Sequence, residues 1–561
     1  VTVVTGRLDT IGQTPCNPSI GGVAKGHLVH EIHALGGYMG RAADACAIHG
    51  RVLNLSKGPA VHSTRVQVDK ARYGALAQAQ LLGHPGITTV EGLVGAIEVE
   101  EREGQTRVCR VRLEDGRELP AAAVVVTTGT FLGGVLHTGT RKTAGGRVGE
   151  APATTLSQHL RALGFRLVRL KTGTPPRLDH RTIAWDKLEP QGSDDPFPRF
   201  CSPDEPDTPA ALPQVHCHIT YTNEGVHELI REHLHESPMY SGQIVGIGPR
   251  YCPSLEDKVV RFADKTRHQI FLEPEGLDPD ALIYPNGIST SLPAEVQLGF
   301  VRRIEGLEQA EIVRPGYAVE YDAVDARALT HALGSKDVAG LYFAGQINGT
   351  SGYEEAGIQG LIAGANAALW LRERSPLEIA RDQGYAGVLI DDLVTQGCDE
   401  PYRMFTSRAE YRLMLREDNA DQRLHALAFE AGLIDEARHE LVKRRVELVD
   451  RCVQLLERGR DEDPSVAPSF IWKKARARRT YAGYLERQRR EVARIRGEKG
   501  DLPLPIDLDY FALEGLTRES AERLARVRPT TTSQAARIPG ITPAALACVW
   551  AHARVSRQQA R

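Results

Sequence analysis

The segment from Gly340 to Leu371 constrains the fold most, because it reads as a strand, a glycine-rich turn and a helix in direct succession. Residues 340–345 are an apolar strand candidate with a glycine at the end, and the turn 346–355 leads into an Ala/Gly-rich helix, 356–371. Unpaired N–H groups and the helix dipole converge at such a turn. The segment therefore predicts an α/β sheet with an anion or flavin-edge site at the turn.

Residues 1–150 follow the same α/β pattern. Val1–Thr5 and Val124–Gly129 contain short β-branched runs, whereas 27–37 and 66–82 have helical spacing. The glycine-rich segment 129–134 comes directly after the second run. Ligands bind at the carboxyl ends of strands in open parallel sheets, so we expect a binding loop there.

The chain of 561 residues predicts about three domains, because single cores stop growing near ~250–300 residues. Strand signals give way to proline-rich, loop-rich sequence after about residue 150, resume near 284 and end near 372. We expect a first α/β part over 1–150, an inserted domain over 151–290, a second α/β part over 291–371 and a helical domain over 372–561.

Composition and cysteine usage indicate a reduced, cytoplasmic protein. The sequence has no apolar run long enough for a membrane helix and no secretory leader at its start. Its nine cysteines are scattered and include no Cys-x-x-Cys pair, which argues against a disulfide framework and a thiolate zinc site. His216-Cys217-His218 lies in an alternating stretch, so we interpret it as a strand and expect no metal.

Two cysteines lie in Gly/Pro-rich loops after apolar segments: Cys16 in Thr14-Pro-Cys-Asn-Pro-Ser-Ile-Gly-Gly22, and Cys252 in the loop 248–258. Such loops expose backbone N–H groups and present a side chain at a site. A thiol there becomes a nucleophile once neighbouring cations or N–H dipoles lower its pKa. The two loops predict one active site, and the alternative is that both cysteines are small buried hydrophobic residues.

A basic segment runs from Lys473 to Lys499, with eleven Lys/Arg against three Glu and with Trp472, Tyr481 and Tyr484 interleaved. Such a face could follow a phosphate backbone and stack unpaired bases. The alternative is a solvated helix face. The residues that we expect to contact nucleic acid are Lys473, Lys474, Arg476, Arg478 and Arg479.

Seven motifs in the same order give the whole chain a resemblance to the MnmG family, also called GidA. They are the Cys16 and Cys252 loops, Asn54-Leu-Ser-Lys-Gly-Pro-Ala60, Leu170-Lys-Thr-Gly-Thr-Pro-Pro-Arg177, Tyr284-Pro-Asn-Gly-Ile-Ser-Thr-Ser-Leu-Pro293, Phe343-Ala-Gly-Gln-Ile-Asn-Gly349 and Glu400-Pro-Tyr-Arg-Met-Phe-Thr-Ser-Arg-Ala-Glu-Tyr-Arg-Leu413. The resemblance implies a glutathione-reductase-like FAD-binding Rossmann domain, an inserted α/β NAD-binding domain and an all-α C-terminal domain.

The resemblance also implies a function. The family is the FAD-dependent subunit that modifies C5 of the tRNA wobble uridine, adding an aminomethyl or carboxymethylaminomethyl group with NADH and a methylenetetrahydrofolate-derived carbon. It acts as a homodimer together with the GTPase MnmE. Its two important cysteines correspond to Cys16 and Cys252. The flavin positions implied are Val94, Ala153 (a serine in relatives), Gln346, Asn348 and Gly349, and the nicotinamide positions are Gly248, Pro249, Arg250, Tyr251, Asp257, Lys258 and Phe262.

One feature of the family is absent from this sequence. The family opens with a strand and a Gly-x-Gly-x-x-Gly turn that holds the FAD pyrophosphate on a helix N-terminus. This sequence begins at what resembles the second strand, with Val1. We therefore expect the first βα unit to be missing here and its neighbouring strands to present unpaired edges. A fragment or a misplaced gene start would explain this, and the alternative is that the chain binds FAD poorly.

Uracil C5 is too weak a nucleophile to attack a carbon donor unaided, so we expect a thiolate, Cys252 or Cys16, to add to C6 and place charge on C5. A general acid/base thiol is the alternative role. Lys258 and Arg250 could depress the pKa of Cys252 or bind a nicotinamide phosphate. Two other functions compete: a folate- and FAD-dependent tRNA (uracil-5-)-methyltransferase, which lacks the long helical tail, and a non-catalytic tRNA-binding protein.

Overall fold

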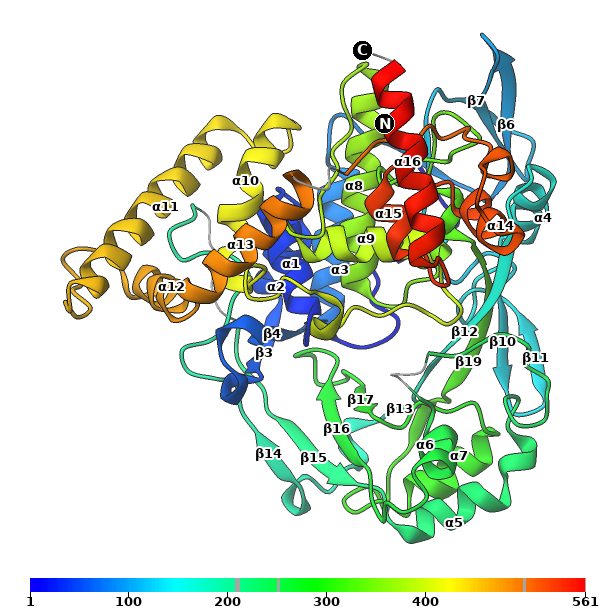
Figure 1. The fold of residues 1–561 in the computed structure, drawn as a ribbon. Helices are drawn as coiled ribbons and strands as arrows, with labels where there is room; N and C mark the ends of the chain where they lie inside the picture. The colour runs from blue at the N-terminus through cyan, green and yellow to red at the C-terminus, as the bar shows by residue number, and fades with distance from the viewer. Residues whose placement is uncertain (207–211, 250–252, 498–500, 560–561) are drawn as a thin grey trace.

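The computed structural model describes residues 1–206, 212–249, 253–497 and 501–559 (Figure 1). It is a mixed α/β fold followed by helices. Figure 1 shows α5–α7 in the lower lobe, away from the C-terminal helices. The helices of the α/β part are α1 (Lys25–Ala34), α2 (Met39–Ala45), α3 (Lys70–Leu82), α4 (Thr154–Ala162), α5 (Glu224–Glu232), α6 (Leu255–Arg261), α7 (Ala294–Val301) and α8 (Tyr353–Leu371).

The parallel strands form two separate pairs. β1 (Thr2–Thr5) pairs with β5 (Thr88–Glu91), and β9 (Val124–Val126) pairs with β20 (Leu341–Phe343). All of β20 is buried, as its apolar sequence predicts. The strands predicted at 1–5, 124–129 and 340–345 are thereby confirmed. The last two of these pair with each other although they are far apart in the sequence.

Two three-stranded antiparallel sheets come from the first part of the chain. One has the order β2 (Ser19–Gly21), β4 (Ser63–Val68) and β3 (Ala47–Leu53), and the other β6 (Val94–Arg102), β7 (Gln105–Leu113) and β8 (Glu118–Pro120). The helix predicted over 66–82 is wrong at its start, since Val66 and Val68 are buried in β4. The helix begins at Lys70, because the Asp69 side chain caps it by accepting from the N–H of Arg72.

Two larger antiparallel sheets complete the α/β part. The four-stranded sheet has the order β11 (Arg141–Ala144), β10 (Val135–Thr138), β19 (Tyr317–Val324) and β12 (Leu167–Thr174). The six-stranded sheet has the order β14 (Glu189–Gln191), β15 (Cys217–Tyr221), β16 (Gln269–Pro274), β17 (Ile283–Asn286), β13 (Arg177–Leu178) and β18 (Ile312–Arg314). The four-stranded sheet combines strands from all three predicted α/β segments, so the boundaries at 150 and 290 stay predictions.

The strand predicted around His216-Cys217-His218 is confirmed as β15. Cys217 and His218 have different neighbours: the Cys217 thiol donates to the Gln67 side-chain oxygen at 3.0 Å, and the His218 ring packs on Trp185. Burial raises the pKa of Cys217 to about 12. The triplet therefore does not converge on one point.

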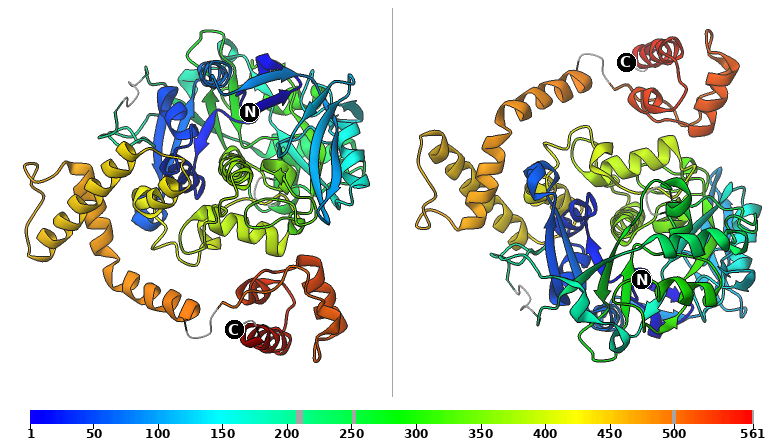
Figure 2. Two further views of the ribbon diagram at one scale, coloured as in Figure 1. Left: turned by 90° about the horizontal axis from the view of Figure 1, so that it is seen from above. Right: turned by 90° about the horizontal axis from the view of Figure 1, so that it is seen from below.

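Within the described ranges, every named element after α8 is a helix: α9 (Tyr385–Gln396), α10 (Ala420–Glu430), α11 (Glu436–Glu457), α12 (Ser469–Thr480), α13 (Ala482–Gly497), α14 (Arg518–Val527), α15 (Thr532–Arg537) and α16 (Pro543–Gln559), besides short 3-10 turns. Figure 2 shows α11–α13 leading round to the terminal bundle α14–α16, which contacts α9. The bundle has its own apolar core. None of the described helices is long and apolar enough to cross a membrane.

Candidate cofactor and thiol site

The loops after β9 and β20 lie at the same edge of the parallel pair. Gly129 follows β9 with φ 56°, and Gly345 follows β20 with φ 87°, a left-handed conformation that favours glycine. Residues 345–348 form a 3-10 turn that ends at Gly349, which also has a positive φ. The predicted binding loops therefore come together where ligands of α/β sheets bind.

A buried amide pair fixes the turn after β20. The Asn348 side-chain amide donates to the Phe343 carbonyl at 2.8 Å and to the Gln359 side-chain oxygen at 2.9 Å. The same Gln359 oxygen accepts from the N–H of Gly345, and the Gly349 carbonyl accepts from the N–H of Tyr402 at 2.7 Å. The turn is thus tied to α8 and to the segment after α9, which makes it a rigid platform.

Orphaned polar atoms occur in both loops. Thr128 Oγ1 and Asn348 Oδ1 are buried and have no hydrogen-bond partner among the described residues. Buried polar atoms are almost always paired in proteins, so each requires an explanation. A bound group with polar edges, such as a flavin dinucleotide, fits this site because it could supply the missing partners.

The α8 N-terminus does not form the expected anion site. Its first turn carries Glu354 and Glu355, both buried, and the Lys25 ammonium contacts their carboxylates at 2.7 and 3.1 Å. These carboxylates already satisfy the positive end of the helix dipole. The geometry therefore argues against the anion alternative, because residues 354 and 355 lie inside the helix rather than in the turn before it. The flavin-edge alternative stays a prediction.

Two predicted flavin residues lie away from the turn. Val94 is the first residue of β6 and is half-buried. Ala153 is buried at the start of α4; its N–H donates to the Phe131 carbonyl at 2.8 Å and its carbonyl accepts from Gly133 at 3.3 Å. Gln346 is half-buried within the turn. The predicted set therefore divides between the turn and the α4 side.

The Cys16 loop is held by three other elements. The Cys16 N–H donates to the Tyr353 hydroxyl at 2.8 Å, and the Arg177 guanidinium donates to the Cys16 carbonyl at 2.6 Å. The Cys16 sulfur lies 3.9 Å from the Tyr284 hydroxyl. Cys16 is half-buried, and the two backbone contacts fix the position of its loop.

The surroundings of Cys16 contain a buried cation, Arg177, and a half-buried one, Lys70. Arg177 stacks over the Tyr284 ring at 4.6 Å and pairs with Glu275 at 2.7 Å, and Lys70 also pairs with Glu275 at 2.8 Å. Burial alone would raise the pKa of Glu275, but Lys70 and Arg177 bring it below its ordinary value. Burial, with the Cys16 sulfur adding to it, raises the pKa of Tyr353 well above its ordinary value. Tyr353 is therefore a neutral hydroxyl.

Cys252, Arg250 and Tyr251 lie outside the described residues. The residues directly before them, 246–249, line a cavity of about 300 Å³ with Lys171, Asp257, Arg261 and Glu400. Gly248, Pro249 and Asp257 are predicted nicotinamide residues in this lining. Two other predicted nicotinamide residues, Lys258 and Phe262, are not among the lining residues. The Lys258 ammonium instead donates to the Gly287 carbonyl at 2.7 Å, and Phe262 lies at the surface, 49% exposed.

The cavity and the turn after β20 are close in space. Glu400 lines the cavity, and Tyr402, two residues later, donates to the Gly349 carbonyl. Lys171 also lines the cavity, and its backbone N–H donates to the Ile247 carbonyl at 3.0 Å. The predicted nicotinamide loop and the predicted flavin turn therefore share neighbours from segments distant in sequence.

The basic residues of α12 differ in their surroundings. Lys474 is mostly buried, with its ammonium 3.2 Å from the Asp421 carboxylate, and its role in tRNA binding stays a prediction. Arg476 pairs with Glu462 at 3.1 Å and Arg478 with Asp450, while both remain partly exposed. Lys473 and Arg479 are exposed, and α12 packs its apolar face, including Trp472, against α11.

Sequence reasoning missed Lys70, Arg177, Glu275, Tyr284 and Tyr353 around the Cys16 loop. Arg177 is the last residue of the motif 170–177, and Tyr284 is the first residue of the motif 284–293. Their places in these motifs are the signal that could have indicated them. Tyr353 lies 337 residues from Cys16, so no local pattern indicates that contact.

The comparisons with known proteins agree with this arrangement. Residues 1–375 match the family described as "Glucose inhibited division protein A", and residues 491–561 match the "tRNA modifying enzyme MnmG/GidA C-terminal helical bundle". Two crystal forms of GidA from Aquifex aeolicus superpose with a TM-score of 0.90. Form II is 42% identical, with 98% of this chain and 94% of that chain covered, and form I is 43% identical, with 98% and 95% covered. The chain belongs to the MnmG/GidA family, a family of tRNA-modifying enzymes.

Proposed function

We propose that this protein modifies C5 of the tRNA wobble uridine, adding an aminomethyl or carboxymethylaminomethyl group with FAD, NADH and methylenetetrahydrofolate as carbon donor. It would act as a cytoplasmic homodimer with the GTPase MnmE. The observation that carries the proposal is the position of Cys16, half-buried and fixed by Tyr353 and Arg177. Such a thiol is available for covalent chemistry on a base.

The turn 345–349 and the loop with Thr128 and Gly129 would hold the FAD, because they contain the orphaned polar atoms and the glycines that permit close approach. Bound there, FAD would supply hydride transfer and reduction of the one-carbon unit. Asn348 and Gln359 would keep the turn in one conformation. The division of the predicted flavin residues between this turn and Ala153 fits a ligand that spans both.

For the base, the chain's own groups would act as follows. The cations Arg177 and Lys70 would favour an anionic sulfur on Cys16, which adds to C6 of the uracil and leaves negative charge on C5. The Tyr284 hydroxyl lies close enough, at 3.9 Å from the sulfur, to exchange a proton with it after modest closure. Cys252 would be the second thiol, and either one could be the nucleophile.

The 300 Å³ cavity would accept part of the NADH, with Lys171 and Arg261 offering positive charge and Gly248 and Asp257 shaping the wall. The tRNA would contact α12 and α13 through exposed cations such as Lys473 and Arg479, in a salt-dependent manner. The C-terminal bundle matched by residues 491–561 distinguishes the chain from the shorter methyltransferase.

The test measures wobble-uridine products by nucleoside mass spectrometry after incubating tRNA with the protein, FAD, NADH, methylenetetrahydrofolate, an ammonium salt as amine donor, MnmE and GTP. Wild type should yield an aminomethyl product, and Cys16→Ser and Cys252→Ser should each yield none. Cys109→Ser, a half-buried cysteine outside the site, is the control. A methylated uridine would instead support the methyltransferase. Near-normal modification by both site variants would exclude the thiol mechanism.

A further inference from the structure

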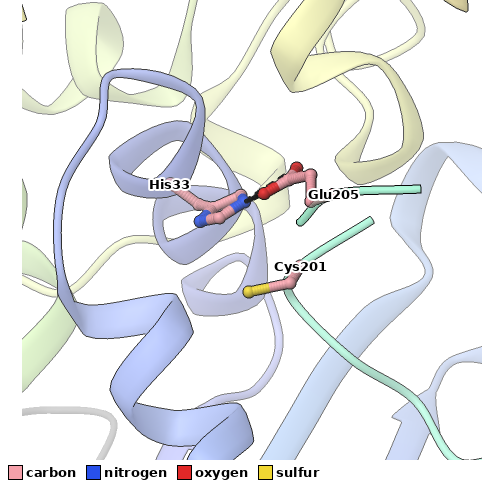
Figure 3. Close-up of side chains that lie close together, drawn as sticks. All are labelled: His33, Cys201 and Glu205. Carbon is pink, nitrogen blue, oxygen red and sulfur yellow. Dashed lines mark hydrogen bonds and ion pairs between the residues drawn. The ribbon is translucent and has the colours of Figure 1, made fainter. Parts of the chain in front are cut away.

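Three potential metal ligands converge away from the proposed active site. His33 near the end of α1, and Cys201 and Glu205 in the loop after β14, place their ligand atoms within 4.8 Å of one another (Figure 3). In the described part of the chain they form the one such group of His, Cys, Asp or Glu. They combine an imidazole, a thiol and a carboxylate, which is a donor set that suits Zn²⁺.

The group is buried and carries an unexplained polar atom. The side chains of His33 and Glu205 are each 7% exposed, and Cys201 is 4% exposed. The His33 Nε2 contacts Glu205 at 2.8 Å, while its buried Nδ1 has no partner within the described residues. The three ligands also line a cavity of about 160 Å³. This cavity leaves room for a further ligand such as water.

The loop that bears Cys201 is held in place independently of any ion. The Asp44 carboxylate accepts from the N–H groups of Phe200 at 3.0 Å and Cys201 at 2.8 Å. Tetrahedral zinc, with bonds of about 2.0–2.3 Å, requires ligand atoms about 3.3–3.8 Å apart. The observed spacing therefore needs only small side-chain adjustments rather than movement of the loop.

From this arrangement we infer that His33, Cys201 and Glu205 form a zinc site that clamps the loop 199–206 onto α1. This site is separate from the proposed tRNA chemistry. Binding converts the Cys201 S–H into a sulfur–metal bond and releases one proton to solvent. Ligation by three protein atoms leaves the fourth position facing the cavity.

One electrostatic feature opposes metal binding. Arg438 lies 3.1 Å from His33 Nε2 and 3.8 Å from Glu205, where its charge opposes a cation.

The experiment titrates the full-length protein, after chelator treatment, with Co²⁺ and then Zn²⁺ in a competition assay. Wild type should bind one Co²⁺ per chain with a thiolate-to-cobalt absorption band. Cys201→Ser should lose the band and bind Zn²⁺ at least about a hundredfold more weakly, since even changes next to the ligands cost 10–100-fold. Cys46→Ser, which removes another buried thiol, should retain both properties.

A second variant tests the site without relying on a loss of binding, which misfolding of Cys201→Ser could also cause. Arg438→Gln removes the opposing positive charge and should tighten Zn²⁺ binding, whereas a purely structural role for these residues predicts no gain. Any one of three results would overturn the site. They are the absence of a thiolate band in wild type, the same band in Cys201→Ser, and Zn²⁺ binding in Arg438→Gln that is no tighter than in wild type.

Discussion

The contact between Tyr353 and the Cys16 loop gives the sharpest prediction. The Tyr353 hydroxyl accepts the Cys16 N–H at 2.8 Å and donates to the Asn17 carbonyl at 3.3 Å. Tyr353→Phe keeps the ring but leaves both groups without this partner. An unsatisfied part-buried polar group costs roughly 1–3 kcal/mol. The loop should therefore spend less time in the arrangement that presents the thiol.

If catalysis needs that arrangement, 1–3 kcal/mol corresponds to a loss of roughly 5- to 150-fold in kcat for wobble-uridine modification. The KM for tRNA should stay unchanged, because the hydroxyl contacts the loop rather than the nucleic acid. The matched control is Tyr342→Phe, whose buried hydroxyl donates to the Asn366 carbonyl at 3.3 Å instead. It should lower stability without lowering kcat.

The assay measures two rates for wild type and for both variants. One is the single-turnover rate of wobble-uridine modification, and the other is the rate of Cys16 alkylation, followed by peptide mass spectrometry. Tyr353→Phe should change both rates, and Tyr342→Phe neither. Equal kcat values for Tyr353→Phe and wild type would refute the claim that Tyr353 positions the thiol. So would an equal loss in the two variants, because that would indicate a general loss of stability.

Three other predictions concern charges. Lys474→Gln should lower the midpoint of thermal unfolding, because it leaves the half-buried Asp421 carboxylate with fewer partners. Replacing the exposed Lys473 with Gln should leave stability unchanged and reduce the salt dependence of tRNA binding in filter assays. The opposite result for the two variants would contradict the geometry. Burial raises the pKa of Glu417 to about 8. The native state therefore holds a proton that the unfolded state releases above its ordinary value of 4.5, so stability should fall by up to about 1.4 kcal/mol per pH unit between these values. Glu417→Gln should flatten that part of a denaturant-unfolding pH series, and an unchanged slope would refute it. Asp391 pairs bidentately with Arg537 of the terminal bundle, so Asp391→Asn should speed hydrogen exchange in α15; unchanged exchange would show that the apolar contacts suffice.

The strand–turn–helix pattern at 340–371 could be predicted because its signals are local. Apolar residues, a glycine and an alanine-rich run define β20, the turn and α8 without reference to the rest of the chain. The same approach misplaced the start of α3, since Val66 has helical spacing with the residues after it but is buried by pairing with β2 and β3. Tertiary burial overrides the local pattern there.

The site itself was predicted only in part. The two cysteine loops and the turn at 345–349 are conspicuous in the sequence because glycine and proline define them. The cations around Cys16 are not, because Arg177 reaches it from 161 residues away. Lys474 illustrates the same point, since a basic run indicates charge but not which of its members faces a carboxylate of the protein itself.

The measurement that tests the central claim most directly is a search for a covalent link between this protein and the wobble uridine. The protein would be quenched during turnover with tRNA and cofactors, digested, and analysed by mass spectrometry for uridine-bearing peptides. Our account predicts an adduct on the peptide containing Cys16 or Cys252. Wobble-uridine modification by a Cys16→Ser, Cys252→Ser double variant at the wild-type rate, with no adduct in either protein, would contradict it.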